Sequence, residues 1–128
     1  MERYTREHAW ARQEGRLVRV GLSAFAGAEL GDVAYVELPA VGRRVVRGEP
    51  ACAIESLKSS SEIYAPVSGT VSEVNAVLAD ERRCGTVNRD PLGEGWLFAL
   101  EPDDLADLDS LMSADEYSHY VSGGGPRS

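Results

Sequence analysis

Residues 53–66 join two β-type segments through a small polar centre and read Ala53-Ile54-Glu55-Ser56-Leu57-Lys58-Ser59-Ser60-Ser61-Glu62-Ile63-Tyr64-Ala65-Pro66. The apolar residues in each segment suit a strand with one buried face, and Pro66 ends the second strand. If the two segments pair as a hairpin, Lys58 lies at or beside its tip, away from the core. The stretch therefore predicts a β-hairpin that presents a lysine.

Lys58 is the single lysine among the 13 basic residues of the chain, and the others are arginines. A covalent swinging arm needs an amine on a long flexible stem with small neighbours, because the attaching enzyme must reach it. An ordinary surface lysine at a turn fits the spacing equally well. The residues alone leave both interpretations open.

Outward from this hairpin, the sequence predicts many short strands with a few helices. We expect two strands around a turn at Gly15 within residues 4–20, and further strands within 33–38, 41–50, 70–74 and 96–100. Apolar residues at near-helical spacing indicate a short helix within 21–31, whereas 75–88 has the composition of a loop. This pattern is typical of one compact sandwich or flattened barrel.

The C-terminal part changes to a helical pattern. After Pro102 the apolar residues fall on one helical face, and we expect Asp103 to cap that helix. Ser113-x-x-Glu116 is the pattern of a capping box for a final short helix. Residues 121–128 are rich in glycine and are expected to be a disordered tail, so residues 1–120 form one domain.

The size and composition suit a single modest core. The chain has 128 residues, of which 43% are hydrophobic, enough to fold without disulfides or a structural metal. Four aromatic residues lie within apolar strand patterns, so we expect them to pack in this core rather than to form a ligand platform: Trp10, Tyr35, Trp96 and Phe98.

Charge and hydropathy limit the function classes. The formal net charge of −8 argues against nucleic-acid binding, which needs clustered cations. An acidic surface favours solubility or docking to basic patches of other proteins. No apolar run reaches the roughly 20 residues of a membrane helix, and the N-terminus lacks the apolar stretch of a secretion signal. We therefore expect a cytoplasmic protein that does not act at a membrane.

No arrangement typical of a catalytic or metal site is visible. Cys52 and Cys84 do not form a Cys-x-x-Cys motif, and His8 and His119 are isolated in the sequence. Cys84 follows two arginines, a setting that lowers a thiol pKa, but no histidine base is near in sequence, so we interpret it as a bystander in a loop. There is no glycine-rich phosphate loop and no serine nucleophile elbow. We expect neither catalytic residues nor a bound metal.

Several motifs follow one another along nearly the whole chain: Tyr4-Thr5-x-x-His8-x-Trp10, Val20-Gly21-Leu22-Ser23, Leu30-Gly31-Asp32-Val33-Ala34-Tyr35-Val36-Glu37-Leu38-Pro39-x-Val41-Gly42, Glu55-Ser56-Leu57-Lys58, Tyr64-Ala65-Pro66-Val67-Ser68-Gly69-Thr70-Val71-x-Glu73-Val74-Asn75, Val87-Asn88-x-Asp90-Pro91-x-Gly93-x-Gly95-Trp96-Leu97 and Ser113-Ala114-x-Glu116-Tyr117. With these motifs in this order and without large gaps, the chain resembles the H protein of the glycine cleavage system.

The resemblance implies a mainly β fold, the lipoyl/biotinyl-type barrel sandwich of two small antiparallel sheets, with short helices that include a C-terminal one. It implies that lipoate is amide-linked to Lys58 by a lipoyl ligase or transferase. Related biotin carriers usually have methionine on both sides of the modified lysine, whereas Leu57 and Ser59 look like the lipoyl version. The residues that the resemblance assigns to ligase recognition are Glu55, Ser56, Leu57 and Glu62.

The implied role is that of a non-catalytic carrier. In the family, a pyridoxal-phosphate glycine decarboxylase loads an aminomethyl group onto the arm, and a folate-dependent aminomethyltransferase removes it. A dihydrolipoyl dehydrogenase then reoxidises the dithiol. The carrier contributes effective concentration, because tethering makes each delivery nearly intramolecular.

The resemblance also implies a cleft that shelters the loaded arm, assigned here to His8, Ala9, Phe25 and Glu62. The family usually has Glu at the position of Ala9, and Tyr or His where Phe25 stands. These changes leave fewer polar partners for a cationic amine, so we expect this cleft to protect an aminomethyl adduct poorly. Neutral drift within an ordinary H protein accounts for the same changes.

Three functions stay open on the sequence. The first is a lipoyl carrier of glycine cleavage. The second is an H-like lipoyl carrier for another task, such as sulfur oxidation, a macrodomain- and sirtuin-linked system or a specialised biosynthesis. The third is an unmodified binding module with the same fold, against which the intact segment Glu55-Ser56-Leu57-Lys58 argues.

Overall fold

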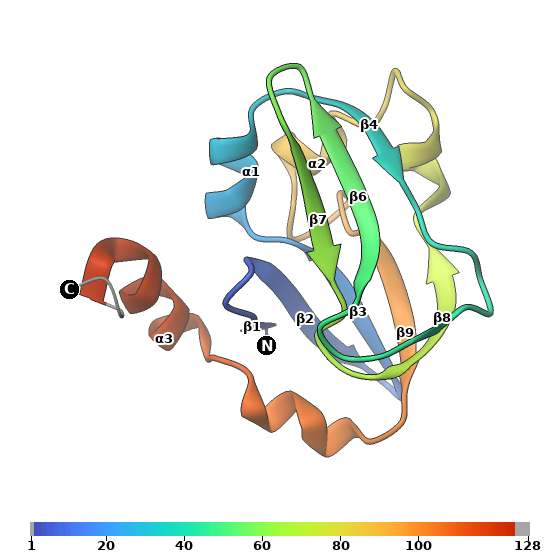
Figure 1. The fold of residues 1–128 in the computed structure, drawn as a ribbon, viewed down its shortest axis with the longest axis vertical. Helices are drawn as coiled ribbons and strands as arrows, with labels where there is room; N and C mark the ends of the chain where they lie inside the picture. Colours follow the sequence, from blue (N-terminus) through green and yellow to red (C-terminus); the bar gives the residue numbers. More distant parts are fainter. Residues whose placement is uncertain (1, 125–128) are drawn as a thin grey trace.

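Two antiparallel sheets form the body of the protein in the computed structural model, which describes residues 2–124. The larger sheet has the strand order β1-β2-β3-β9-β8-β5, and its strands are β1 (Glu2–Tyr4), β2 (Ala9–Glu14), β3 (Leu17–Leu22), β5 (Arg44–Val45), β8 (Gly69–Val74) and β9 (Phe98–Pro102). The smaller sheet has the order β4-β6-β7, with β4 (Val33–Glu37), β6 (Pro50–Ser56) and β7 (Ser60–Tyr64). Figure 1 shows the β6–β7 hairpin in front of the larger sheet. The expected mainly β fold with two antiparallel sheets is confirmed.

The core fills the space between the sheets. Alternation along the strands sends Val18, Val20 and Leu100 from the larger sheet and Ile54 and Ile63 from the smaller sheet into one buried cluster. Each such side chain contributes about 1.5–3 kcal/mol when it is fully buried. The smaller sheet therefore has one face fixed by packing, which also fixes the register of its hairpin.

The N-terminal hairpin forms as the sequence predicts. Gly15 has φ +65°, which a tight turn between β2 and β3 requires. Trp10 is fully buried and lies opposite Gly21, where a Cβ would come 2.5 Å from the indole. Glycine at this position therefore lets the indole cross the neighbouring strand.

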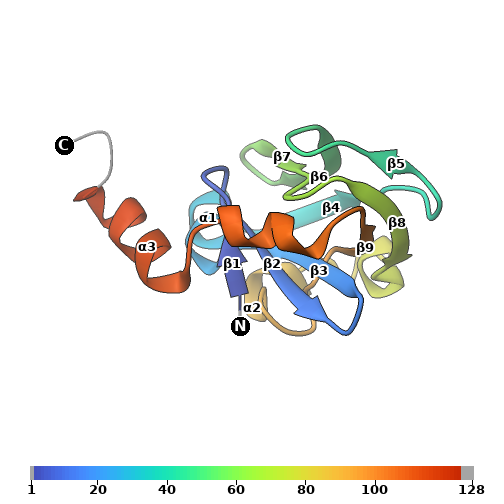
Figure 2. The same ribbon diagram turned by 90° about the horizontal axis from the view of Figure 1, so that it is seen from below.

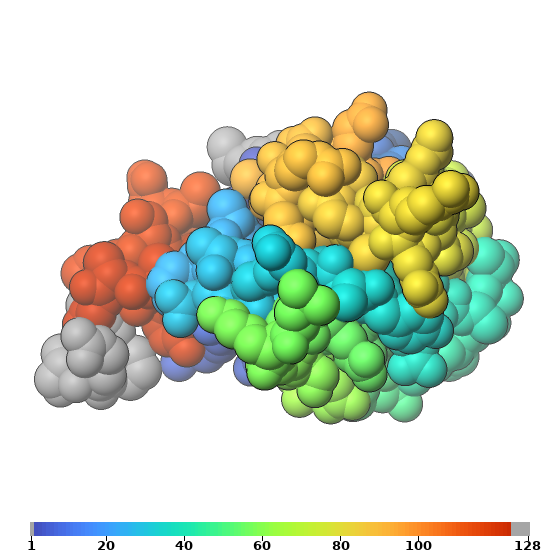
Figure 3. All heavy atoms as spheres, turned by 90° about the horizontal axis from the view of Figure 1, so that it is seen from above, coloured from blue at the N-terminus to red at the C-terminus, as the bar shows by residue number. Residues whose placement is uncertain are grey.

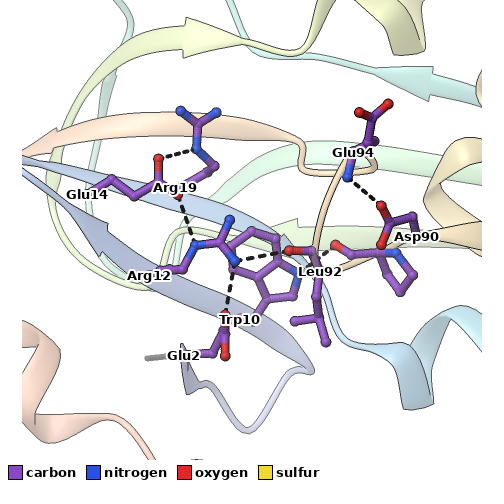
Figure 4. Close-up of polar contacts among 9 residues, drawn as sticks. Glu2, Trp10, Arg12, Glu14, Arg19, Asp90, Leu92 and Glu94 are labelled. Atoms are coloured by element: carbon purple, nitrogen blue, oxygen red, sulfur yellow. Dashed lines mark hydrogen bonds and ion pairs between the residues drawn. The ribbon is translucent and has the colours of Figure 1, made fainter.

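Polar contacts tie the segment after α2 to this hairpin (Figure 4). The indole N–H of Trp10 donates to the carbonyl of Pro91 at 2.8 Å, and Arg12 donates to the carbonyl of Leu92 at 3.0 Å. Arg12 also forms ion pairs with Glu2 and Glu14. These contacts hold the residues that directly follow α2 against strand β2.

The aromatic residues divide between core and surface. Trp10 and Phe98 are fully buried, as expected. Trp96 is half-buried and packs against the guanidinium of Arg19, whose Cζ lies 4.1 Å from the centroid of the indole ring. The prediction for Tyr35 was wrong, because this ring lies on the outer face of β4 and is 45% exposed. Alternation at β4 turns Val36 inward and Tyr35 outward, and a β-bulge between Val33 and Tyr35 shifts the register.

Three short helices, α1, η1 and α2, lie where the sequence predicts one helix and a loop. Helix α1 (Ala24–Leu30) lies within the expected range and begins at Ser23, whose side chain accepts a hydrogen bond from the amide of Ala26. The segment expected to be a loop instead contains η1 (Ala76–Ala79) and α2 (Thr86–Arg89). Each is only one turn long, too short for a periodic pattern to show in the sequence.

The C-terminal helices differ in one cap from the prediction. Asp104, not Asp103, caps η2 (Leu105–Ser110), because the side chain of Asp103 forms an ion pair with Arg44 instead. The predicted capping box of Ser113 and Glu116 is confirmed at the start of α3 (Ala114–His119). The chain then continues into η3 (Tyr120–Gly124), which covers the first residues of the expected disordered tail; residues 125–128 of that tail lie outside the described residues.

Figures 1 and 2 both show α3 standing to one side of the two sheets. The helix contacts the body through Tyr117, which is buried and stacks on the ring of Tyr4. Within residues 2–124, no helix is both long and apolar enough to span a bilayer.

Candidate functional site

Lys58 lies at the turn of the β6–β7 hairpin. The strands pair with Glu55 opposite Ser60 and Ile54 opposite Ser61, and residues 57–59 between β6 and β7 form the turn. Lys58 is exposed, and its neighbour Leu57 is 79% exposed. The hairpin tip therefore projects an amine away from the core, as the sequence predicts.

The hydroxyl of Ser56 organises this turn. Its Oγ accepts hydrogen bonds from the amides of Lys58 at 3.2 Å and Ser59 at 3.0 Å. The amide of Ser56 donates to the carbonyl of Ser59 at 2.8 Å. Side-chain acceptance of this kind is how serine stabilises tight turns. Ser56 is half-buried. Its hydrogen bonds therefore fix the backbone of the turn around the lysine.

The tip is also anchored to the connection between α1 and β4. The amide of Leu57 donates to the carbonyl of Asp32 at 3.1 Å. At Gly31, a Cβ would come 3.0 Å from Cε of Lys58 and 3.7 Å from its Nζ. The stem of the lysine therefore lies along the backbone of Gly31, where the absence of a side chain leaves room for it.

Gly31 has a conformation that other residues adopt at a cost. Its φ is +82° and its ψ is −167°, a region that is essentially restricted to glycine. Its carbonyl accepts a hydrogen bond of 2.8 Å from the side chain of Asn88, whose Oδ1 accepts one of 2.9 Å from the amide of Val33. Asn88 in α2 therefore fixes the backbone along which the lysine stem lies.

A pocket of about 320 Å³ opens between α1 and the serines of the hairpin, beside Lys58. Its walls are formed by His8, Leu22, Phe25, Ala26, Glu29, Leu30 and Ser59–Ser61. Figure 3 shows the hairpin (green) against the α1 and β4 segment (light blue and cyan) on this side of the molecule. The pocket combines apolar walls with hydroxyl groups and one carboxylate.

His8 is held in this pocket in an unusual backbone conformation. Its φ of +74° is the one positive value among the non-glycine residues in the described part of the chain. Its ring lies 5.3 Å from that of Phe25, measured between centroids. Burial lowers the pKa of the imidazole, against a smaller opposing effect of the Glu7 carboxylate. The imidazole is therefore biased towards its neutral form.

The structure brings together only some of the residues expected in the cleft. His8 and Phe25 lie in the pocket. Ala9 is 1% exposed and packs in the core between the sheets, paired with Leu22. Glu62 lines a separate depression with Glu37. Of the expected ligase-recognition residues, Glu55 and Glu62 share the outer face of the hairpin because of strand alternation.

Glu29 is the pocket carboxylate that the sequence analysis missed. It is an exposed residue of α1, one turn from Phe25, and lines the same pocket. The spacing of four residues on an expected helix was the available signal. Gly31 and Asn88 were also missed, because their role depends on a contact between segments far apart in the sequence.

The two thiols take no part in the site. Cys52 is buried in β6, and burial raises its pKa to about 12. Cys84 is buried as well, and its thiol lies 3.4 Å from the carbonyl of Val33. Burial raises the pKa of Cys84 despite the two arginines that precede it. Within residues 2–124 there is also no group of His, Cys, Asp and Glu side chains that could hold a metal ion.

Comparison with known proteins gives one consistent match. The family model described as glycine cleavage H-protein matches residues 2–123. A glycine cleavage system H protein from Thermus thermophilus is 53% identical over 118 residues, which cover 92% of this chain and 91% of that protein. One from Geobacillus kaustophilus is 45% identical over 122 residues, which cover 95% of this chain and 94% of the relative.

A solved structure gives the same result for the fold. The crystal structure of a glycine cleavage system H protein from Mycobacterium marinum superimposes with a TM-score of 0.81. It is 35% identical and covers 97% of both chains. The two sheets and their helices are therefore shared over essentially the whole described structure.

Proposed function

The chain belongs to the glycine cleavage H-protein family, and on that premise we propose that Lys58 is the attachment point of its lipoyl group. The chain is a lipoyl carrier of the glycine cleavage system, with the barrel-sandwich fold of that family. The observation that carries the assignment is the position of its single lysine at the tip of the β6–β7 hairpin.

The surroundings of Lys58 fit an attached group. The amine is exposed, and within residues 2–124 no carboxylate forms an ion pair with it. Gly31 leaves a groove for the stem that a Cβ would fill. When bound, lipoate supplies a disulfide–dithiol couple that can accept and release cargo. The protein itself supplies a fixed starting point for the arm and small neighbours that do not obstruct it.

Attachment requires an enzyme that recognises the hairpin. We assign this recognition to Glu55, Leu57 and Glu62, which project from the tip or its outer face. Ser56 acts indirectly, because its side chain holds the turn. A lipoyl ligase or transferase would thus read the shape of a rigid turn together with two carboxylates.

The chain works with the other components of the glycine cleavage system. We assign its partners as the pyridoxal-phosphate glycine decarboxylase, the folate-dependent aminomethyltransferase and the dihydrolipoyl dehydrogenase. No catalytic residue is needed in the carrier, because tethering raises the effective concentration of the cargo at each partner. The cytoplasmic location expected from the sequence stays a prediction.

The pocket beside Lys58 is the proposed shelter for the loaded arm. Phe25 and Leu22 supply apolar walls, and Glu29 supplies a carboxylate that can pair with a cationic amine. Glu29 therefore gives the pocket a negative charge, which the sequence analysis did not expect with Ala9 in place of the usual glutamate. Its pairing favours retention of an aminomethyl group.

Reconstitution tests the proposal. Glycine cleavage by the decarboxylase, aminomethyltransferase and dehydrogenase should require this chain and should be lost with Lys58→Arg. A matched variant combines Lys58→Arg with Arg82→Lys, which keeps one lysine and places it at a side chain that is 92% exposed. It should also be inactive. Full activity of either variant would contradict the assignment of Lys58.

A further inference from the structure

The hydroxyl of Tyr117 connects the C-terminal helix to the pocket. It lies 2.7 Å from Nδ1 of His8 and 2.7 Å from Oγ of Ser23. Ser23 in turn caps α1 by accepting a hydrogen bond from the amide of Ala26 at 3.1 Å. A continuous chain of polar contacts therefore runs from α3 to the two elements that form one wall of the pocket.

The ring of Tyr117 is held independently of this hydroxyl. It stacks on Tyr4, with centroids 4.4 Å apart and an interplanar angle of 8°. The capping box of Ser113 and Glu116 fixes the start of α3. Because packing and capping hold the ring, the hydroxyl is free for a second task, which is to hold the imidazole of His8.

His8 depends on this contact for its orientation. Its Nδ1 is bound to Tyr117, so Nε2 is the nitrogen that remains for a group inside the pocket. The positive φ of His8 aims its side chain from the turn between β1 and β2 towards α1, where it meets Phe25. Strained backbone of this kind persists where the surrounding contacts determine it.

We propose that Tyr117 is a positioning residue, which fixes the imidazole of His8 in the pocket wall so that it contacts the loaded arm. The C-terminal helix, which otherwise stands to one side of the body (Figures 1 and 2), thereby becomes part of the arm-sheltering site. This inference rests on the proposed function, since it assigns the pocket to the arm of Lys58.

Tyr120 provides a matched control. Its ring lies 6.2 Å from that of His8, and its hydroxyl donates to the carbonyl of Arg6 at 3.3 Å. Tyr120→Phe therefore removes a hydroxyl from the same aromatic cluster without removing the bond to His8. Tyr117→Phe keeps the stacked ring and the capping box but removes the bridge.

The first measurement uses unlipoylated protein. Ring-to-ring nuclear Overhauser effects between His8 and Phe25, together with the imidazole ¹⁵N shifts, report the orientation of His8. We expect Tyr117→Phe to weaken these effects at least twofold and to move the Nδ1 shift, and Tyr120→Phe to leave both as in the wild type. An unchanged His8 ring in Tyr117→Phe would overturn the proposal, whatever the state of Lys58.

The second measurement uses protein carrying an aminomethyl-loaded arm. We expect Tyr117→Phe to release ammonia and formaldehyde several-fold faster than the wild type at a temperature where both are folded, with Tyr120→Phe unchanged. Equal release rates would overturn the proposal even if the His8 ring had moved. A protein that cannot be lipoylated at Lys58 would instead contradict the proposed function, and the ring measurement would still decide the orientation of His8.

Discussion

The side chain of Asn88 donates a 2.8 Å hydrogen bond to the carbonyl of Gly31, which is 57 residues away in the sequence. Through Gly31 this contact reaches the stem of Lys58, which lies along the glycine backbone. The base of the proposed arm therefore depends on a one-turn helix from a different part of the chain. Residues 75–88, which the composition predicts to be a loop, therefore help to hold the backbone beside Lys58 in place.

Replacing Asn88 tests this support. Asn88→Ala removes the bonds to Gly31 and Val33, and we expect a loss of about 2 kcal/mol in the free energy of unfolding, since each bond contributes about 0.5–1.5 kcal/mol. Urea unfolding of the wild type and the variant measures this loss. Within residues 2–124, the side chain of the neighbouring exposed Arg89 hydrogen-bonds only to Thr86 of the same helix, so Arg89→Ala should cost less than about 0.5 kcal/mol. Equal losses in both variants would contradict the role of Asn88.

Gly31 itself allows a sharper test of the lysine groove. Gly31→Ala introduces a methyl group 3.0 Å from Cε of Lys58, and we expect it to slow lipoylation by a ligase several-fold. Gly42 is the matched control, because its φ is +93° but nothing lies within 4 Å of a Cβ built there. Both variants carry a backbone cost of about 1–3 kcal/mol. Only Gly31→Ala should change the rate of lipoyl attachment, measured below the unfolding temperature.

The hairpin could be predicted from the sequence because its determinants are local. Alternating apolar residues and a polar centre define the strands and turn of residues 53–66, and Ser113 and Glu116 define a cap by spacing alone. The prediction that Tyr35 packs in the core failed, because a residue inside an apolar strand can face either side of the sheet. Only the packing of the other sheet decides which side is buried.

The pocket could be predicted only in part, because it is assembled from distant segments. His8 and Phe25 were identified through the family resemblance and do lie together. Glu62 was expected there through the same resemblance, but it lines a separate depression with Glu37. Nothing local in the sequence places Tyr117 beside His8, since 109 residues separate them.

Glu29 should matter for cargo retention. Because its carboxylate can pair with a cationic amine, we expect Glu29→Gln to speed the loss of an aminomethyl group from the loaded arm several-fold. Glu62→Gln removes the same charge at a residue that lines a different depression. The release of ammonia from loaded protein is the measurement. If Glu29→Gln released ammonia as slowly as the wild type, the carboxylate would have no role in retention and the apolar walls alone would shelter the cargo.

The pH dependence of stability should carry the signature of His8. Its pKa in the folded protein is below the ordinary value of 6.5, so the unfolded chain binds more protons as the pH falls through that range. Stability should therefore decrease between pH 7.5 and pH 5.5.

Urea unfolding at the two pH values measures this effect, and His8→Asn should reduce it, since asparagine tolerates a positive φ. The carboxylates with lowered pKa, such as Glu2 and Glu14, affect stability at lower pH, below their ordinary value of 4.5. A decrease that is the same in wild type and His8→Asn would show that other groups cause it.

The intact mass of the protein from a lipoate-supplied host tests the central assignment most directly. We expect one lipoyl addition, located on Lys58 by fragmentation. We expect no addition when Lys58→Arg is combined with Ser59→Lys, because this change moves the amine by one residue, away from the backbone of Gly31. An unmodified wild-type chain, or full modification of the shifted lysine, would contradict a carrier whose arm is placed by this hairpin.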